Sequence, residues 1–373
     1  MVNKGQNNAP QKVYFFGPSW RGKRAYERWQ MYDNAGYQVV GFVSTRRPQG
    51  DMCMGLPIVR PEEVAIDAVV VFCVPRKAVP GLYEQLWNHG VRKFYRDREV
   101  NANIVGTSFL LNECVTVGRC DAGTLVYAEM HVCDHCNLNC RGCTHYSPIF
   151  ESVLPDLDKR LADISLLKEK VTNILVFRLM GGEPLLHPGL PSFVEKVRAL
   201  LPETDLRLVT NGLLIPTASD QLLEAIARCD VAVDVSEYAP THKIRDRIER
   251  KFSEFGIKYT ITDWNRKQEF LIPLSLSGNS RYEHFCLSDD CVNLWEGKIA
   301  RCPSVMYLER LNEVFDVHLP GEGVYQLSSC PNGAELIGLL EQPIPLCTHC
   351  VDHSVTWERC GKSITVEDFA VAD

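Results

Sequence analysis

The chain has 373 residues, which is enough for two or three domains with an ample core. Its hydrophobic content of 45% and charged content of 23% are ordinary for a soluble globular protein. With 40 basic against 47 acidic residues the net charge is -7, which argues against a nucleic-acid groove, so no nucleic-acid partner is expected.

The start of the chain and its cysteine usage predict the compartment. The first residues are polar, no apolar run reaches the length of a membrane span, and no export signal is visible. The 16 cysteines without a signal peptide indicate a reducing cytosol with metal or redox chemistry rather than a disulfide framework. We therefore expect a cytoplasmic protein with no membrane partner.

Residues 1–112 are predicted to form a small Rossmann-like α/β domain. The expected strands are 12–17, 37–43 and 68–74, and the expected helix is 24–34. The turn Gly17-Pro-Ser-Trp-Arg-Gly22 does not match G-x-G-x-x-G, and Ser44 begins a basic segment where an acidic ribose-binding residue is expected. Two interpretations stay open: a nucleotide or nucleotide-sugar site, or, as we prefer, a module for substrate docking or assembly.

Residues 113–265 repeat a strand–helix rhythm, which predicts a parallel barrel or partial barrel. The expected strands are 124–132, 173–179, 206–210, 231–236 and 258–263, and the expected helices are 161–172, 192–201, 220–228 and 242–255. A cysteine run after the first of these strands, the segment Gly181-Gly-Glu-Pro184, Asn211 and Ser236 all fall at or just past strand ends. Because these ends meet at one mouth of a parallel barrel, we expect the four features to gather there.

The cysteine run, Cys136-Asn-Leu-Asn-Cys140-Arg-Gly-Cys143, is the most informative feature of the chain. A three-residue gap followed by a two-residue gap suits thiolates that ligate one iron–sulfur cluster, and three ligands leave one iron open to another ligand. Two alternatives compete: a four-cysteine zinc site that includes Cys133, and a scatter of unrelated thiols. Zinc ribbons usually separate their cysteine pairs by a dozen or more residues, so we prefer the cluster.

Residues 266–373 change character: they are rich in turns, proline and cysteine, and have few long periodic helices. We expect this block to depend on a metal for its fold.

The cysteine run followed by Gly181-Gly-Glu-Pro184 closely resembles the radical S-adenosylmethionine (SAM) superfamily, over residues from about 120 to 265. The resemblance implies a partial (β/α)6 barrel in which three thiolates hold a 4Fe–4S cluster whose open iron binds SAM. The implied cluster ligands are Cys136, Cys140 and Cys143, and the implied SAM-binding residues are Gly181, Gly182, Glu183, Pro184, Asn211 and Ser236. The family often has an aromatic residue before the third cysteine to pack on adenine; this chain has Gly142, and Tyr146 is a candidate replacement.

The last block resembles the twitch form of the SPASM-type extension, which binds one auxiliary 4Fe–4S cluster. Ten residues separate Cys286 from Gly297, four more precede Cys302, and Cys347-Thr-His-Cys350 follows after a long gap. The resemblance assigns Cys286, Cys302, Cys347 and Cys350 as the auxiliary ligands. Cys291 in place of Cys286, or a zinc ion on the same four thiols, are the alternatives.

The subgroup implies an enzyme that removes hydrogen from a carbinol carbon of a carbohydrate-type small molecule, most simply an epimerase. A non-ligand thiol would return the hydrogen on the other face, and Cys330 and Cys360 are the candidates, ahead of Cys229, Cys291 and Cys133. An alcohol dehydrogenase, a dehydratase and a peptide-modifying maturase are the alternatives. A flavodoxin- or ferredoxin-type protein is the implied electron donor.

Overall fold

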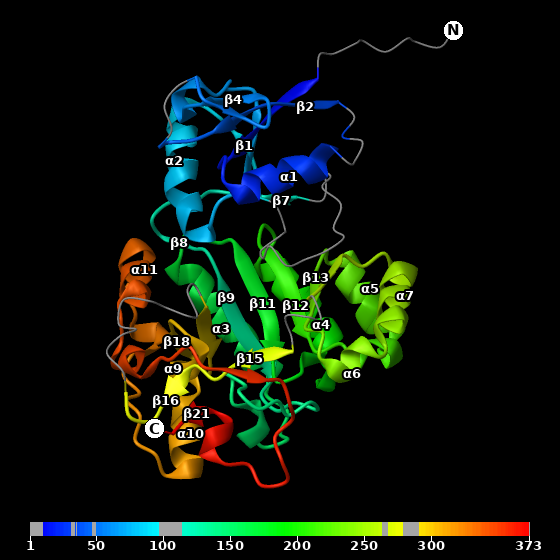
Figure 1. Cartoon of the computed structure of the whole chain (residues 1–373), viewed down its shortest axis with the longest axis vertical. Coiled ribbons are helices and arrows are strands. Elements are labelled where there is room, and N and C mark those ends of the chain that lie inside the picture. Colours follow the sequence, from blue (N-terminus) through cyan, green and yellow to red (C-terminus); the bar gives the residue numbers. More distant parts are fainter. Residues whose placement is uncertain are drawn as a thin grey trace. The chain divides into compact units, whose positions relative to one another are not determined.

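A computed structural model describes residues 10–30, 34, 36–46, 50–96, 114–262, 268–278 and 291–372 (Figure 1). The chain divides into two compact units, Met1–Ala122 and Gly123–Asp373. The expected domain boundaries after residues 112 and 265 both lie outside the described residues.

The first unit is built on a seven-stranded sheet in the order β3-β4-β2-β1-β5-β6-β7. Its strands are β1 (Gln11–Phe16), β2 (Tyr37–Val43), β3 (Met52–Cys53), β4 (Leu56–Val59), β5 (Val69–Phe72), β6 (Lys93–Arg96) and β7 (Val115–Thr116), and its helices are α1 (Trp20–Gln30) and α2 (Val79–His89). The run β4-β2-β1-β5-β6 is parallel, so the chain winds outward from β1 in both directions.

Helix α1 begins four residues before the predicted start at residue 24, directly on the turn that follows β1. Gly22 makes this close approach feasible, because a Cβ there would overlap the carbonyl oxygen of Gly17. Phe15, Trp29 and Phe42 then pack edge to face in the core of the unit.

The second unit contains an eight-stranded sheet in the order β14-β13-β12-β11-β9-β17-β18-β19. Its strands are β9 (Ala128–Cys133), β11 (Val176–Gly181), β12 (Asp205–Thr210), β13 (Ala232–Val235), β14 (Tyr259–Ile261), β17 (Val292–Trp295), β18 (Lys298–Ala300) and β19 (Val324–Gln326). The strands from β14 to β17 in this order are parallel, so their carboxyl ends share one edge of the sheet.

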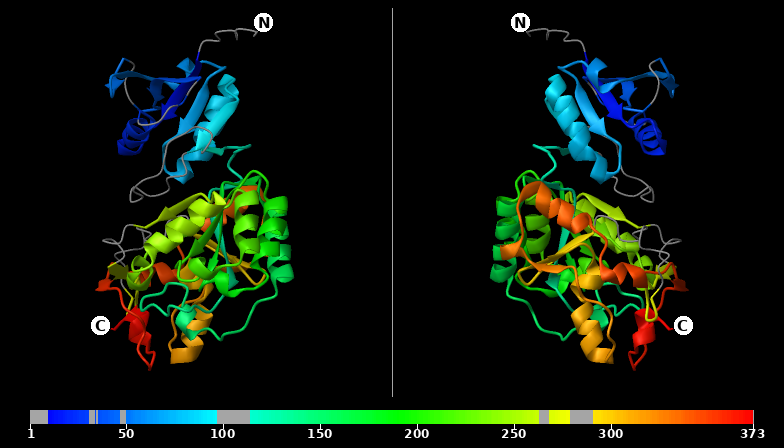
Figure 2. Two further views of the ribbon diagram at one scale, coloured as in Figure 1. Left: turned by 90° about the vertical axis from the view of Figure 1, so that its right-hand side faces the viewer. Right: turned by 90° about the vertical axis from the view of Figure 1, so that its left-hand side faces the viewer.

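Helices cover one face of this sheet, as the green helices in Figure 2 show. They are α3 (Leu157–Lys170), α4 (Leu190–Leu200), α5 (Asp220–Arg228) and α7 (Arg245–Phe255), preceded by the short α6 (Ala239–His242). Met130, Leu179 and Leu208 point from successive strands into the apolar core between sheet and helices. Because side chains alternate along a strand, their sequence neighbours point to the opposite face.

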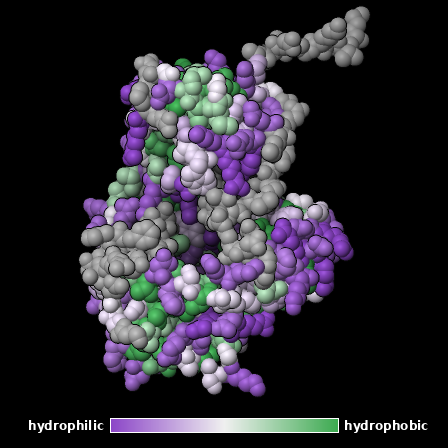
Figure 3. Space-filling view, viewed as in Figure 1, coloured by the Kyte–Doolittle hydropathy of each residue, from purple (hydrophilic) through white to green (hydrophobic). Residues whose placement is uncertain are grey.

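The helix predicted over 242–255 is divided into α6 and α7, with Ile244 in a non-helical conformation between them. The second part, α7, exposes a charged face, seen as purple at the right of Figure 3. On it Arg245 and Glu249 pair at 2.9 Å one helical turn apart.

The last block is not a separate compact unit, because β17 pairs in parallel with β9, the strand that leads into the cysteine run. Two small pairings complete it: β15 (Glu269–Leu271) with β20 (Ser354–Thr356), and β16 (Leu274–Ser275) with β21 (Ala370–Val371). Its helices are α9 (Pro303–Met306), α10 (Leu308–Phe315) and α11 (Gly333–Glu341). All three are short, in keeping with a block predicted to have few long helices.

Within the described part of the chain, no helix combines the length and the apolar character that a membrane crossing needs.

Candidate functional site

The three cysteines of the run lie in a loop at the carboxyl end of β9. The Tyr238 ring stacks on Trp357, whose indole donates to Cys140 Sγ, and burial together with the charges of Cys140, Cys143 and Cys136 raises the pKa of Tyr238. Tyr238 follows β13, so the cysteine loop and a later strand end meet as predicted.

The thiols are surrounded by hydrogen-bond donors. The Leu138 amide donates to Cys136 Sγ at 3.4 Å, and the Trp357 indole Nε1 donates to Cys140 Sγ at 3.2 Å. Burial alone would raise the pKa of Cys143, but a hydrogen bond and the charge of His145 lower it. Burial raises the pKa of Cys136 to about 11, so that thiol would lose its proton on binding metal, and donors aimed at the sulfurs would then stabilise the thiolates that iron ligation requires.

No three His, Cys, Asp or Glu side chains among the described residues are grouped so that they could hold a metal ion. Each cysteine of the run would instead bind a different iron of a cluster. The donor set fits such a cluster, and Cys136, Cys140 and Cys143 stay its candidate ligands.

The Gly181–Pro184 segment holds the beginning of the cysteine loop. The amides of Gly182 and Glu183 donate to the carbonyl oxygens of Cys133 (2.8 Å) and His135 (3.1 Å). A Cβ on Gly181 would overlap the Cys133 carbonyl, and one on Gly182 would overlap that of His135. Both glycines are therefore required by the close approach of two backbones.

Glu183 is fully buried and joins this segment to the end of β12. Its carboxylate accepts hydrogen bonds from Thr210 Oγ1 (2.7 Å), the Asn211 amide (2.9 Å) and the Leu185 amide (3.1 Å). Burial raises the pKa of Glu183 to about 7, against the effect of these donors. The residue therefore fixes the backbone around the site.

The two other strand-end residues also lie at this edge of the sheet. Asn211 Nδ2 donates to Asn137 Oδ1 at 2.7 Å and lies 3.7 Å from Cys136 Sγ, so it contacts the cysteine loop. Ser236, directly after β13, donates its amide to the carbonyl of Thr210, the last residue of β12. Both remain candidate SAM-binding residues, together with Gly181, Gly182, Glu183 and Pro184.

The structure does not support Tyr146 as a residue that packs on adenine. Its side chain is 1% exposed, contacts Phe369 edge-on and donates to the Ser304 carbonyl at 3.4 Å, so it belongs to a packed core. Phe270, from the last block, lies against Gly142 instead: a Cβ there would be 2.9 Å from its ring. Sequence reasoning missed this ring because it comes from another part of the chain.

Charged side chains line the face of the sheet that the helices leave uncovered. Asp234 lies 3.1 Å from both Arg178 and Arg207, and Glu129 lies 3.2 Å from His145. Burial alone would raise the pKa of Asp234, but the charges of Arg207 and Arg178 lower it. Polar residues alternate with apolar residues along β9, and this alternation is the feature of the sequence that indicates a polar face.

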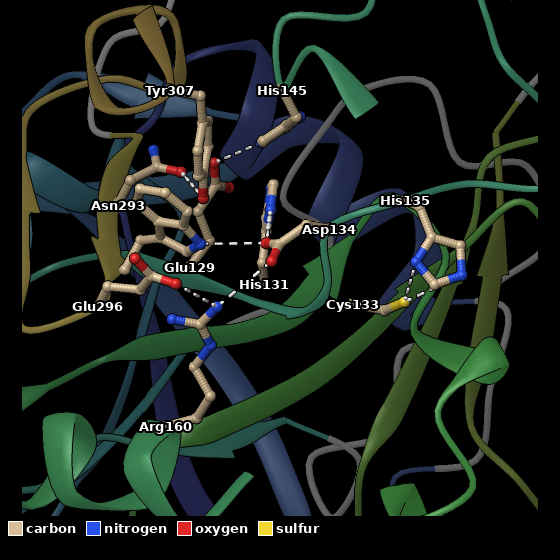
Figure 4. Close-up of polar contacts among 11 residues, drawn as sticks. Glu129, His131, Cys133, Asp134, His135, His145, Arg160, Asn293, Glu296 and Tyr307 are labelled. Carbon is tan, nitrogen blue, oxygen red and sulfur yellow. Dashed lines mark hydrogen bonds and ion pairs between the residues drawn. The ribbon is translucent and has the colours of Figure 1, made fainter. Parts of the chain in front are cut away.

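Asp134, directly after β9, gathers groups from several elements (Figure 4). It accepts from Trp295 Nε1 (3.1 Å), contacts His131 Nδ1 (2.9 Å), and lies 3.5 Å from Arg160. The His131 ring stacks on Tyr307 with centroids 4.2 Å apart. This group fixes the end of β9 from which the cysteine loop departs.

The two candidate donor cysteines lie in different places. The Cys360 amide donates to the Asn139 carbonyl within the cysteine loop at 2.8 Å, and the Cys143 charge contributes to the raised pKa of Cys360. The Cys330 carbonyl oxygen instead accepts a hydrogen bond at 2.6 Å from Lys170, the last residue of α3. The part of α3 that lies near the cysteine loop is Arg160, which contacts Asp134. Arg160 and Lys170 are about 15 Å apart along the helix, so the structure does not bring Cys330 to the cysteine loop.

The proposed auxiliary ligands are described only in part, because Cys286 lies outside the described residues. Cys302 and Cys347 pack against the apolar core that contains Tyr146. The Cys350 amide donates to the Cys347 carbonyl at 3.2 Å, so Cys350 follows in the same short segment. Three of the four auxiliary candidates therefore share one neighbourhood.

Comparison with known proteins identifies the central segment. Residues 130–261 match the family model described as "Radical SAM superfamily". This segment holds both the cysteine run and Gly181–Pro184, so the chain contains a radical SAM domain.

Curated relatives match over a similar segment. A GTP 3',8-cyclase of Microcystis aeruginosa is 34% identical over 116 residues, which are 29% of this chain and 34% of the relative. A GTP 3',8-cyclase of Helicobacter pylori is 32% identical over 141 residues, which are 36% of this chain and 43% of the relative. The matches span about a third to two fifths of the length of these relatives.

Among solved structures, the crystal structure of BtrN in complex with AdoMet and 2-DOIA has a TM-score of 0.40 at 16% identity, covering 61% of this chain and 92% of BtrN. Streptococcus suis SuiB bound to the precursor peptide SuiA has a TM-score of 0.31 at 17% identity, covering 48% of this chain and 37% of SuiB.

Proposed function

We propose that the chain is a radical SAM enzyme that epimerises a carbinol carbon of a carbohydrate-type substrate. A reduced 4Fe–4S cluster with SAM supplies, when bound, a carbon-centred radical that removes hydrogen from an unactivated C–H bond. The proposal is carried by Cys360, a cysteine outside the run whose main-chain amide bonds the cysteine loop and which packs, with Cys143, against the same apolar core.

Cys360 has the protonation state that a hydrogen-atom donor needs. Burial raises its pKa to about 12, and the charges of Asp368 and Cys143 act in the same direction, so the S–H bond is intact at neutral pH. The thiol would transfer its hydrogen atom to the substrate carbon radical on the opposite face. The resulting sulfur radical needs one electron and one proton, for which the proposed auxiliary cluster at Cys302, Cys347 and Cys350 is the electron source.

The polar face of the sheet, opposite the helices, supports a hydroxyl-rich substrate. Glu129, Arg178 and Asp234 supply both donors and acceptors there, as recognition of several hydroxyl groups requires. A closed polar pocket would also keep bulk water from the radical.

Alcohol dehydrogenation is the second candidate, and the surroundings of Tyr146 favour it. Cys143 packs against the same apolar core as Cys302 and Cys347, so the two proposed clusters would both adjoin this core. The substrate radical would lose its hydroxyl proton and pass one electron to the auxiliary cluster, and a ketone would form without a donor thiol.

Product analysis separates the two candidates. Anaerobically reconstituted enzyme would be assayed for 5′-deoxyadenosine with candidate sugars, sugar nucleotides and GTP, the substrate in the name of the matched relatives. Solvent deuterium should enter the substrate carbon. Cys360→Ala should stop epimerisation while 5′-deoxyadenosine still forms, whereas Cys330→Ala should epimerise normally.

A ketone product, or epimerisation by the Cys360→Ala enzyme, would refute the epimerase. Iron content checks a separate point: a loss of about half the iron from Cys360→Ala would make this residue a cluster ligand instead.

A further inference from the structure

The carboxyl-terminal segment Thr356–Asp368 wraps around the cysteine loop with main-chain hydrogen bonds. The Arg141 amide donates to the Glu358 carbonyl (3.0 Å), and the Gly142 amide donates to the Asp368 carbonyl (2.6 Å). Cys140 and Arg359 form an antiparallel bridge between the two segments. The cysteine loop is therefore shaped by residues more than 200 positions later in the chain.

Side chains strengthen the same contact. Arg141 pairs with Glu358 at 2.7 Å and lies 3.6 Å from Asp368. The Glu358 pair is half exposed, so its ionic contribution is small, but two carboxylates on one guanidinium fix the register of the two segments.

Among the contacts described, Trp357 is the one residue of this segment whose side chain is hydrogen-bonded to a thiol of the cysteine run. Its indole Nε1 donates to Cys140 Sγ at 3.2 Å, and Cys140 is buried. The indole stacks on Tyr238 (5.4 Å between centroids, 29° between planes), which in turn contacts Phe270 edge-on. The ring is thus held on its face while its N–H is aimed at the sulfur.

We propose that Trp357 is a positioning residue that sets the reduction potential of the cluster ligated by Cys140. An N–H group donated to a ligating sulfur stabilises negative charge there, and the reduced cluster places more charge on its sulfurs than the oxidised one. The hydrogen bond therefore favours reduction. The inference rests on the proposed cluster. It concerns the potential at which that cluster accepts an electron, and the proposed reaction alone does not specify this potential.

Trp357→Phe tests this inference, because Phe keeps an aromatic ring for Tyr238 and has no N–H donor. The cluster would be reconstituted in both proteins, its iron and sulfide counted, and its potential measured by a redox titration followed by electron paramagnetic resonance. At a fixed potential we expect the ratio of reduced to oxidised cluster to fall about tenfold, which is about 59 mV for one electron.

Two further variants make the result specific. Trp87→Phe, a change at an exposed indole of the first unit, should leave the potential unchanged. Trp357→His, which retains a ring N–H, should recover part of the loss.

Equal potentials in wild type and Trp357→Phe, with equal iron content, would overturn the inference and leave the proposed enzyme intact. Failure of the wild-type protein to assemble any cluster would overturn both. A variant that loses iron as well would support the positioning role only if its remaining cluster also shows the lower potential.

Discussion

Replacing Asp234 by Asn removes a negative charge from between two guanidinium groups. The carboxylate lies 3.1 Å from both Arg178 and Arg207, and it also accepts from Thr260 Oγ1 at 2.7 Å. Asp205 still neutralises Arg207 at 2.9 Å, but Arg178 loses its carboxylate partner. Breaking a buried pair costs about 3–5 kcal/mol, and because Asp205 remains we expect a loss of about 3 kcal/mol in the free energy of unfolding.

Denaturant unfolding measures this loss, and Asp230→Asn is the matched control. Asp230 pairs with Lys258 at 2.8 Å, but its side chain is 57% exposed, so the same chemical change there should cost about 0–1 kcal/mol. Both variants keep the size and shape of the side chain.

The pH dependence gives a second readout. The folded-state pKa of Asp234 is lowered. Its contribution to the free energy of unfolding is therefore present above the unfolded-state pKa of about 3.9, and is lost as the pH falls through the folded-state pKa. The difference between wild type and Asp234→Asn should therefore be constant near neutral pH and shrink in acid. A loss no larger than that of Asp230→Asn, or one that grows in acid, would refute the reasoning.

Three further substitutions probe the cysteine loop. Gly182→Ala places a methyl group on the His135 carbonyl, so the loop must shift and iron bound after reconstitution should fall several-fold, as measured by iron content. Glu183→Gln places an amide NH2 group where the carboxylate now accepts hydrogen bonds, so two donors face each other. This should lower the unfolding free energy by about 1–3 kcal/mol in denaturant titrations. Gly142→Ala meets both a φ of +75° and the Phe270 ring, so it should lower the melting temperature, whereas Gly338→Ala, in an open helical position, should not.

Elements with a strong local period were predicted well from the sequence. Tyr37–Val43 and Asp220–Arg228 have the predicted bounds, and the latter begins with a Ser219 cap whose side chain accepts from Leu222. The cysteine run and Gly181–Pro184 meet as predicted, because parallel strands bring their carboxyl ends to one edge.

Contacts between distant segments were not predictable in the same way. Trp357 and Phe270 reach the cysteine loop from short, turn-rich stretches without periodicity, so no local pattern marks them. Tyr146 was assigned by its nearness in sequence, yet its backbone adopts a left-handed conformation and its ring enters a core. Sequence distance is a poor guide wherever a tight turn redirects the chain.

The parallel pairing of β17 with β9 limits where the protein can be cut. A fragment that stopped near residue 265 would lack β17 and leave the main-chain N–H and C=O groups of β9 without partners along one side. Such a bare, apolar strand invites association with other chains. Expression of the central segment alone should therefore yield aggregates, whereas a fragment from Gly123 to the carboxyl terminus keeps that flank covered.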